Sequence, residues 1–195
     1  MRAPPVALTL AVLLPLIACG PAAPYVQLPT DAVIGAGDPT RAAIIGSAYA
    51  FGAPSSIAAR PAAAARAAAQ VEFLAAETPS GPRYFEYSPS IGQELTAARD
   101  ELRMALGIAP GASPQAVVDG LYAVSRALGA QDGPAATTAL MAPVFQDGQV
   151  TLTRLGSLPP LPRTRIATAL TNSEMNRVDQ DGRFSGSGGG DGGKN

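Results

Sequence analysis

The chain has 195 residues and a formal net charge of −1, with 14 basic and 15 acidic side chains. This near balance argues against electrostatic binding of nucleic acids, which depends on a strongly basic surface. The sequence contains no histidine and a single cysteine. These counts exclude a histidine-based catalytic triad, a histidine-ligated zinc ion and an intrachain disulfide bond.

The first residues have the features of an export signal. Arg2 and the terminal amine form a short positive start, and an apolar run follows from residue 6 to residue 18. That run is shorter than the ~20 residues with which a helix crosses the hydrocarbon core of a bilayer. A positive start, a short apolar run and small residues at its end are typical of a cleaved signal.

The only cysteine lies at the end of this run, in the tetrapeptide Leu-Ile-Ala-Cys at residues 16–19. This tetrapeptide resembles the lipobox of bacterial lipoproteins. The resemblance implies that a signal peptide, residues 1–18, is cleaved between Ala18 and Cys19, and that Cys19 carries a diacylglyceryl group. Two or more acyl chains are enough for stable attachment to a bilayer. An ordinary secretory signal and an uncleaved membrane anchor are the alternatives.

Residues 19–37 contain several prolines and glycines and are expected to be a tether that lifts the body off the membrane. The less favoured alternative is that Tyr25, Val26 and Leu28 dock this segment on the body. In enterobacterial lipoproteins, Asp after the lipidated cysteine favours the inner membrane. Gly20 stands there in this chain, so the resemblance implies the outer membrane, with the body facing the periplasm.

Capping residues and apolar spacing predict an all-α fold, a single bundle of about five helices at residues 38–178, which is the size of one domain. Helices are expected at about residues 38–51, 90–107, 113–129 and 164–178, with a shorter one at 134–142. A further helix ends at about residue 77 and is expected to begin either near residue 55 or at residue 61. Residues 179–195 are rich in glycine and are expected to form a disordered tail.

The apolar spacing also predicts which side of each helix faces the core. The helix at 90–107 has the clearest pattern, with Ser90 as its cap and Gly107 at its end. Its expected core residues repeat every three or four positions: Ile91, Leu95, Ala98, Leu102 and Ala105. On the same grounds the first helix is expected to bury Ala42, Ile45, Ala48 and Tyr49, and the last to bury Ile166, Leu170 and Ser173. The alanine-rich helix at 61–77 is expected to form by intrinsic propensity, even if weakly packed.

Two segments between the helices have their own predictions. Residues 150–155 (VTLTRL) alternate in polarity after Asp147-Gly148 and suggest a short extended piece. Residues 157–162 are rich in proline and predict a stiff polyproline-like connector, with docking into an aromatic groove as the less common alternative.

Tyr84, Phe85 and Tyr87 concentrate three of the ten aromatic residues in one segment between helices. They are a possible interaction patch, because tyrosine makes a good anchor at protein interfaces. The favoured interpretation is that these rings fill a core that is otherwise short of large side chains. In the helix at 90–107, Arg99 and Arg103 are expected to share a solvated face.

No residues in the sequence have the spacing of a catalytic or metal centre. Asp179 to Gly182 resemble the middle of a calcium loop, but Arg177 and Gly188 stand where acidic ligands are required. The serines have no histidine to activate them, and Lys194 is the only lysine. We therefore expect no enzymatic activity, no cofactor and no metal.

These features predict a non-enzymatic, lipid-anchored envelope protein that serves as a scaffold or accessory subunit. Its expected partners are the membrane, through the lipid on Cys19, and another envelope protein, but no nucleic acid. The alternative is a carrier or sensor that binds a small apolar ligand in a cavity between helices.

Overall fold

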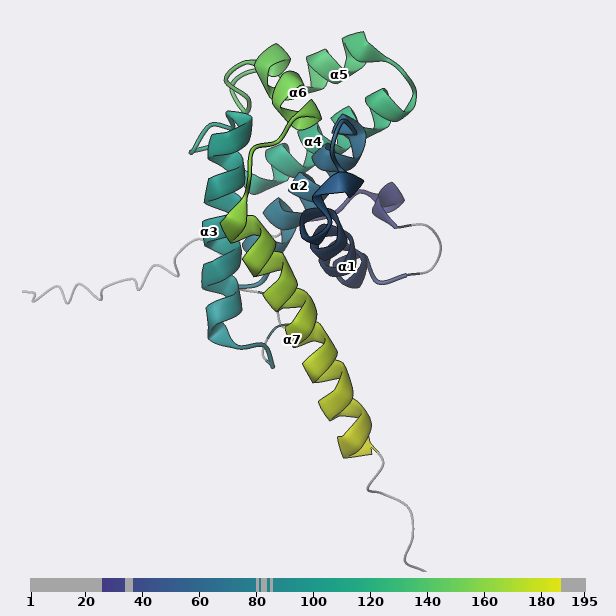
Figure 1. The fold of residues 1–195 in the computed structure, drawn as a ribbon, viewed down its shortest axis with the longest axis vertical. Helices are drawn as coiled ribbons and strands as arrows, with labels where there is room; N and C mark the ends of the chain where they lie inside the picture. The colour runs from purple at the N-terminus through teal and green to yellow at the C-terminus, as the bar shows by residue number, and fades with distance from the viewer. Residues whose placement is uncertain (1–25, 34–36, 80, 82–83, 85, 187–195) are drawn as a thin grey trace, which may run out of the picture.

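The computed structural model describes residues 26–33, 37–79, 81, 84 and 86–186 (Figure 1). The described part confirms the all-α class, because it contains helices and no strand. It has seven α-helices where about five were expected. They are α1 (Pro39–Gly52), α2 (Pro61–Glu77), α3 (Pro89–Leu106), α4 (Pro114–Gly129), α5 (Gly133–Ala139), α6 (Gly148–Gly156) and α7 (Pro162–Gly186), with short 3-10 turns η1 (Thr30–Ala32) and η2 (Pro54–Ser56).

Helix α2 lies at the centre and contacts α1, α3, α4 and α6. The expectation that it is weakly packed was wrong, since residues on every side of the helix are buried, from Ala64 and Ala65 to Val71 and Leu74. Alanine has so small a side chain that neighbouring helices approach its backbone closely, which is how an alanine-rich helix serves as a core. The buried set also includes the polar side chains of Gln70 and Glu72.

The predictions for α3 and α4 are confirmed almost to the residue. Gly107 ends α3 in the left-handed conformation, with φ of 72°. Ser113 caps α4, where its hydroxyl oxygen accepts a hydrogen bond from the Ala116 N–H at 3.3 Å. The cap of α3 differs from the prediction, because the helix begins at Pro89 and Ser90 therefore lies in its first turn.

The segment at 150–155 is helical, so the extended prediction for it was wrong. Asp147 caps α6, and its carboxylate accepts from the Val150 N–H at 3.0 Å. Thr151 and Leu155, one turn apart, are the buried residues of this helix. The Thr151 hydroxyl donates to the carbonyl of Leu106 at 2.8 Å, which fixes α6 to the end of α3.

Helix α7 packs beside α1 and α3 and continues to Gly186, beyond the predicted end at about residue 178. Arg41, near the start of α1, donates to the carboxylate of Asp179, in the second half of α7, at 3.1 Å, so the two helices run antiparallel. Its core stripe is formed by Thr164, Ala167, Thr168 and Thr171, all buried. The Thr168 and Thr171 hydroxyls donate to backbone carbonyls one turn earlier, at 2.9 and 2.8 Å. Polar side chains therefore enter the core with their hydrogen bonds satisfied.

The predicted core faces of α1 and α7 were wrong. Ile45 and Tyr49 of α1 are 49% and 68% exposed, and Ile166 and Leu170 of α7 are 48% and 44% exposed. The buried side of α1 is formed instead by Ala43, Ile44, Ser47, Ala50 and Phe51. Both helices thus present on the outside the apolar side chains whose spacing marked them as core.

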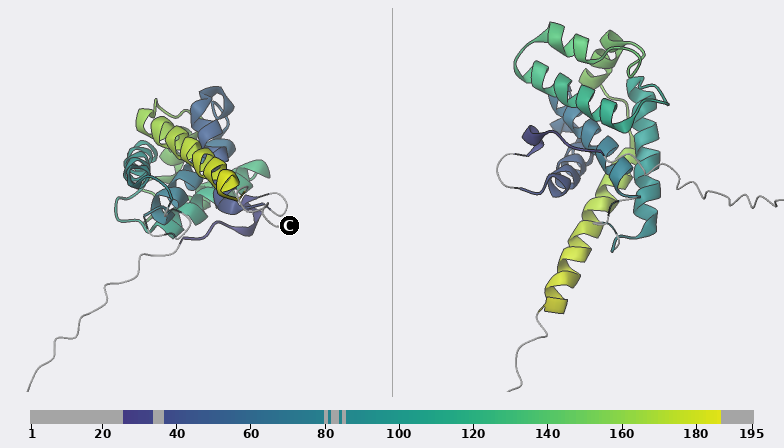
Figure 2. Two further views of the ribbon diagram at one scale, coloured as in Figure 1. Left: turned by 90° about the horizontal axis from the view of Figure 1, so that it is seen from below. Right: turned by 180° about the vertical axis from the view of Figure 1, so that it is seen from behind.

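Part of the predicted tether lies on the body. Val26 is 1% exposed, and its N–H donates to a carboxylate oxygen of Glu77 at 2.9 Å. Gln27 exchanges two hydrogen bonds with the side chain of Gln115, and Ala32 is buried. The right-hand view of Figure 2 shows this segment crossing the back of the molecule. Among the described helices none is both long enough and apolar enough to span a membrane.

Candidate functional site

The predicted aromatic patch is partly inside the protein. Tyr84 is only 7% exposed and meets the ring of Tyr87 edge-on, with centroids 5.3 Å apart. Burial, followed by the nearby Tyr87, raises the pKa of Tyr84 above its ordinary value. Phe85 lies outside the described residues. The burial of Tyr84 agrees with the core-filling interpretation and leaves Tyr87, which is half-buried, as the accessible ring.

The predicted solvated face of α3 contains a buried ion pair instead. Arg103 and Glu72 have side chains only 9% and 4% exposed. The Arg103 guanidinium donates to both oxygens of the Glu72 carboxylate and, at 2.9 Å, to the carbonyl of Pro110. Each group satisfies the other, so the pair ties α2 to α3 and leaves no free acid or base for chemistry. The expected exposure of Arg103 was wrong, because apolar spacing says nothing about which charge has a buried partner.

The residues that resemble a calcium loop are part of a helix. Asp179 and Asp181 lie in α7, where Asp179 pairs with Arg41 and Asp181 accepts from Arg177 at 2.7 Å. A helix cannot wrap these carboxylates around one ion as a calcium loop does. Across the described part of the chain, no three acidic or cysteine side chains come together as a metal site would require.

An open groove of about 810 Å³ lies between two connections of the fold. One wall is the end of α1 and the turn into α2, with Phe51, Pro54 and Ile57. The other is the proline-rich connector from α6 to α7, with Leu158 and Leu161 among its residues. Figure 1 shows both connections on the face toward the viewer. The predicted stiff connector therefore forms one side of a mostly apolar groove.

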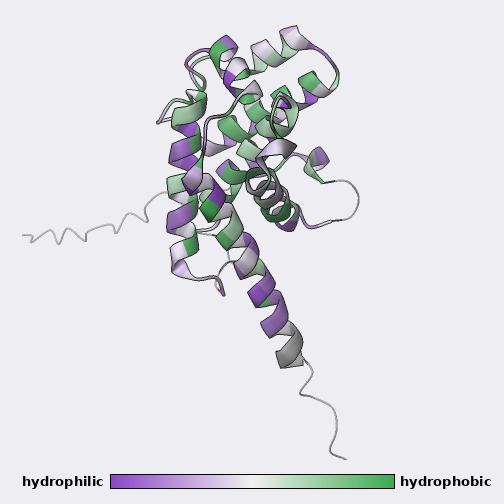
Figure 3. Cartoon of the chain, in the orientation of Figure 1, coloured by the Kyte–Doolittle hydropathy of each residue, from purple (hydrophilic) through white to green (hydrophobic). Residues whose placement is uncertain are grey.

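The exposed apolar residues of α1 and α7 lie outside the lining of the groove. Arg165 lines the groove and is followed in the chain by the exposed Ile166. Figure 3 shows hydrophobic stretches on α1 and the first part of α7, and hydrophilic ones on its distal part. We call the exposed set, Ile45, Tyr49, Ile166 and Leu170, the outward apolar face. The groove is the candidate binding site.

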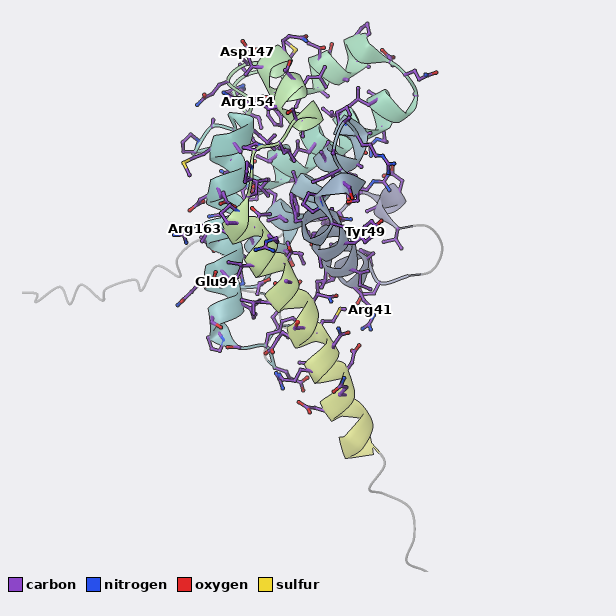
Figure 4. All side chains as sticks on the ribbon, viewed as in Figure 1. Arg41, Tyr49, Glu94, Asp147, Arg154 and Arg163 are labelled. Atoms are coloured by element: carbon purple, nitrogen blue, oxygen red, sulfur yellow. The ribbon has the colours of Figure 1, made fainter. Side chains whose placement is uncertain are left out.

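Charge sets this region apart from the rest of the molecule. Two stretches, residues 39–71 and 148–173, supply both walls of the groove and the outward apolar face, and neither contains Asp or Glu. They hold six arginines, which leaves eight basic against fifteen acidic residues elsewhere in the chain. Figure 4 marks three of the six: Arg41 and Arg163, on the two helices of the outward apolar face, and Arg154, on α6. Among the residues that line the groove, Arg165 is the one charged side chain, so the groove is mostly apolar with a single positive charge.

The remaining predicted site residues, Ala18 and Cys19, precede the described part of the chain. Sequence reasoning missed the groove, although the absence of acidic residues from two long stretches was visible in the sequence. No protein family, curated protein or solved structure matches this chain.

Proposed function

We propose that this protein is a lipid-anchored lipoprotein of the bacterial envelope and a non-enzymatic scaffold or accessory subunit. In this proposal Cys19 carries the lipid, the outer membrane holds it, and the body faces the periplasm. The lipobox-like tetrapeptide at residues 16–19 is the observation that carries the proposal, and the docking of the segment that begins at Val26 limits how far the body would lie from Cys19.

The distance from the anchor to the body is short. Six residues separate Cys19 from Val26, and even a fully extended chain of that length spans no more than about 25 Å. Val26 itself is buried, and its N–H is bound by Glu77. A lipid on Cys19 would therefore hold the body near the bilayer, not at the end of the longer tether expected for residues 19–37.

The candidate binding site lies on the other side of the body from this attachment. The segment from Val26 crosses the back of the molecule, whereas the proline-rich connector and the turn from α1 into α2 lie at the front (Figures 1 and 2). An anchor at the back favours an orientation in which the groove points away from the bilayer. This orientation suits a protein that presents a surface to a partner in the periplasm.

A carrier of a small apolar ligand is the second candidate. The groove volume of about 810 Å³ is within the ~300–1,000 Å³ of small-molecule sites. Against this candidate, the groove is open along the surface, whereas a carrier was expected to enclose its ligand between helices.

The anchor is tested by fractionating cells that express the wild-type chain or Cys19→Ser. We expect the wild type with the membranes and the variant released, since the acyl chains supply the attachment. Gly20→Ala is the matched control and should stay with the membranes. Intact mass of the purified wild type should show cleavage before Cys19 and added acyl chains, and an unmodified thiol would contradict the proposal.

A further inference from the structure

We propose that the groove binds a single-chain amphiphile with an apolar tail and one carboxylate head, as a fatty acid has. This inference goes beyond the proposed scaffold function and does not depend on the lipid anchor. Three properties of the groove carry it: its apolar walls, its fixed and open shape, and its single charge.

The walls of the groove are almost wholly apolar. One wall contributes Phe51, Pro54 and Ile57, and the other contributes the leucines and prolines of the connector at 157–162. Because proline has no N–H group, the connector offers few backbone donors to a ligand. An alkyl chain suits such walls, since each CH2 group that leaves water favours binding and no polar group of the ligand has to be satisfied.

The prolines also give the groove a fixed shape. Pro159, Pro160 and Pro162 restrict the backbone of the connector, because their rings lock φ. The opposite wall is part of the core, since Phe51 and Ile57 are buried. Walls of this kind resist collapse when the groove is empty. A ligand therefore binds without the cost of ordering the protein around it.

The one charge of the groove, on Arg165, selects the head of the ligand. Among the described residues, no acidic side chain forms an ion pair with Arg165. A guanidinium donates two parallel hydrogen bonds to a carboxylate, so a carboxylate head would supply the missing partner. A cationic amphiphile of the same length would instead be repelled.

The acidic residues that approach α1 and the start of α7 have other partners. Asp38 and Asp179 lie beside Arg41, which precedes the groove residue Phe51 by ten positions, or about 15 Å along α1. Glu101 of α3 accepts hydrogen bonds from the first N–H groups of α7. These carboxylates are engaged by other groups, and the guanidinium in the groove is left for a ligand.

The open shape of the groove agrees with a ligand that has a charged end. A wholly apolar molecule in an open groove would keep part of its surface in water. The tail of an amphiphile lies against the walls while its head stays partly solvated, which avoids the cost of burying a charge. The openness that counts against an enclosed carrier therefore favours an amphiphile.

The test measures binding of laurate to the full chain carrying Cys19→Ser, by isothermal titration calorimetry at low salt. The matched probe is dodecylammonium, which has the same number of carbons and the opposite charge. We expect laurate to bind at least about tenfold more tightly than dodecylammonium. Octanoate, which is four carbons shorter, should bind at least about tenfold more weakly than laurate, because each CH2 group on the walls contributes about two- to fourfold.

Two pairs of variants locate the head of the ligand. Arg165→Gln should weaken laurate about tenfold, while Arg163→Gln removes the same charge outside the groove lining and should have little effect. Ala58→Asp places a carboxylate in the groove, so it should weaken laurate and tighten dodecylammonium. Ala169→Asp, off the groove, should change neither. Circular dichroism of these four variants should match the parent, because each of the four side chains is exposed.

A third pair locates the tail. Leu158→Ala removes part of the connector wall and should weaken laurate and dodecylammonium alike. Met141→Ala, at an exposed apolar residue outside the groove lining, should weaken neither. The apolar run at residues 6–18 is the same in all six variants, so differences among them report binding in the groove and not binding to that run.

Several results would overturn the inference. Equal affinity for laurate and dodecylammonium, no binding of either, or an equal loss in Arg163→Gln and Arg165→Gln would remove the role given to the groove. If laurate does not bind and the chain forms a dimer that Ala58→Asp abolishes, the occupant is a second copy of the chain. The Cys19→Ser chain carries no lipid, so these results are independent of the fractionation that tests the anchor.

Discussion

In α2 the side chains on all sides are buried, down to Gln70 and Glu72, whereas α7 buries one stripe and leaves Ile166 and Leu170 in solvent. The apolar side chains of α2 are mostly alanines and those on the outside of α7 are large. Burial in this protein therefore follows the fit between helices more than the hydrophobicity of single residues. Stability should depend on α2, while the exterior of α7 is free to serve recognition.

The largest difference in stability between α2 and α7 is expected when one partner of the buried ion pair is removed. Glu72→Ala leaves the Arg103 guanidinium buried without its carboxylate, and we expect a loss of about 3–5 kcal/mol in the free energy of unfolding. Urea denaturation followed by circular dichroism measures this loss. On α7, removal of Asp181, the exposed partner of Arg177, should cost far less, because solvent screens an exposed ion pair.

The double variant Glu72→Leu with Arg103→Leu separates pairing from burial. It removes both charges together, so it should be markedly more stable than Glu72→Ala. If Glu72→Ala costs no more than the surface variant, the pair does not stabilise the fold and the central role given to α2 is wrong.

A smaller effect is expected from enlarging one alanine on each helix. Ala65 of α2 is 0% exposed, and Ala65→Leu inserts three carbons into a filled space. We expect it to lower the free energy of unfolding by about 1–3 kcal/mol. Ala169→Leu, on the exposed side of α7, should change it by less than about 0.5 kcal/mol. Equal effects at the two positions would show that α2 has spare room around it.

The smallest effects concern pH. Burial raises the pKa of Tyr84, near the end of α2, so unfolding becomes easier once the unfolded tyrosine loses its proton. Stability should be level below about pH 10 and fall above it by up to about 1.4 kcal/mol per pH unit, until the folded-state pKa is passed. On α7, the hydrogen bond from Arg177 lowers the pKa of Glu174, so the ionised Glu174 stabilises the folded state. This stabilisation is lost as the pH falls through the folded-state pKa.

Thermal unfolding at a series of pH values measures both limbs. Tyr84→Phe should make the alkaline limb less steep, and the slope that remains belongs to Tyr87 and Tyr122, whose pKa values burial also raises. A limb that stays equally steep in Tyr84→Phe would assign it to other groups.

The sequence predicts the helices of this protein better than their orientations. Capping residues and glycine stops are local signals, which is why α3 and α4 are correct almost to the residue. The buried side of a helix is decided by its neighbours, and threonines replace larger apolar residues in the core of α7 because their hydroxyls bond to the helix backbone. At 150–155 two local signals disagree. The alternating polarity predicted an extended segment, but the cap at Asp147 starts a helix there.

The candidate site was partly visible in the sequence. The connector at 157–162 was predicted to be a stiff spacer. The apolar residues that are exposed on α1 and α7 were predicted to lie in the core. Their association depends on contacts between residues more than a hundred positions apart, such as Arg41 with Asp179. No local pattern reveals such contacts, so the sequence does not show that the connector lies opposite the turn from α1 into α2 and forms the groove with it.

The antiparallel contact of α1 with α7 also bears on the order in which the chain is made. Of the described helices α7 is made last, yet it packs against α1, which is made first. Contacts between distant parts of a chain form slowly and late. A nascent chain that has not yet reached α7 therefore cannot cover that side of α1, and its core stays open until α7 is made.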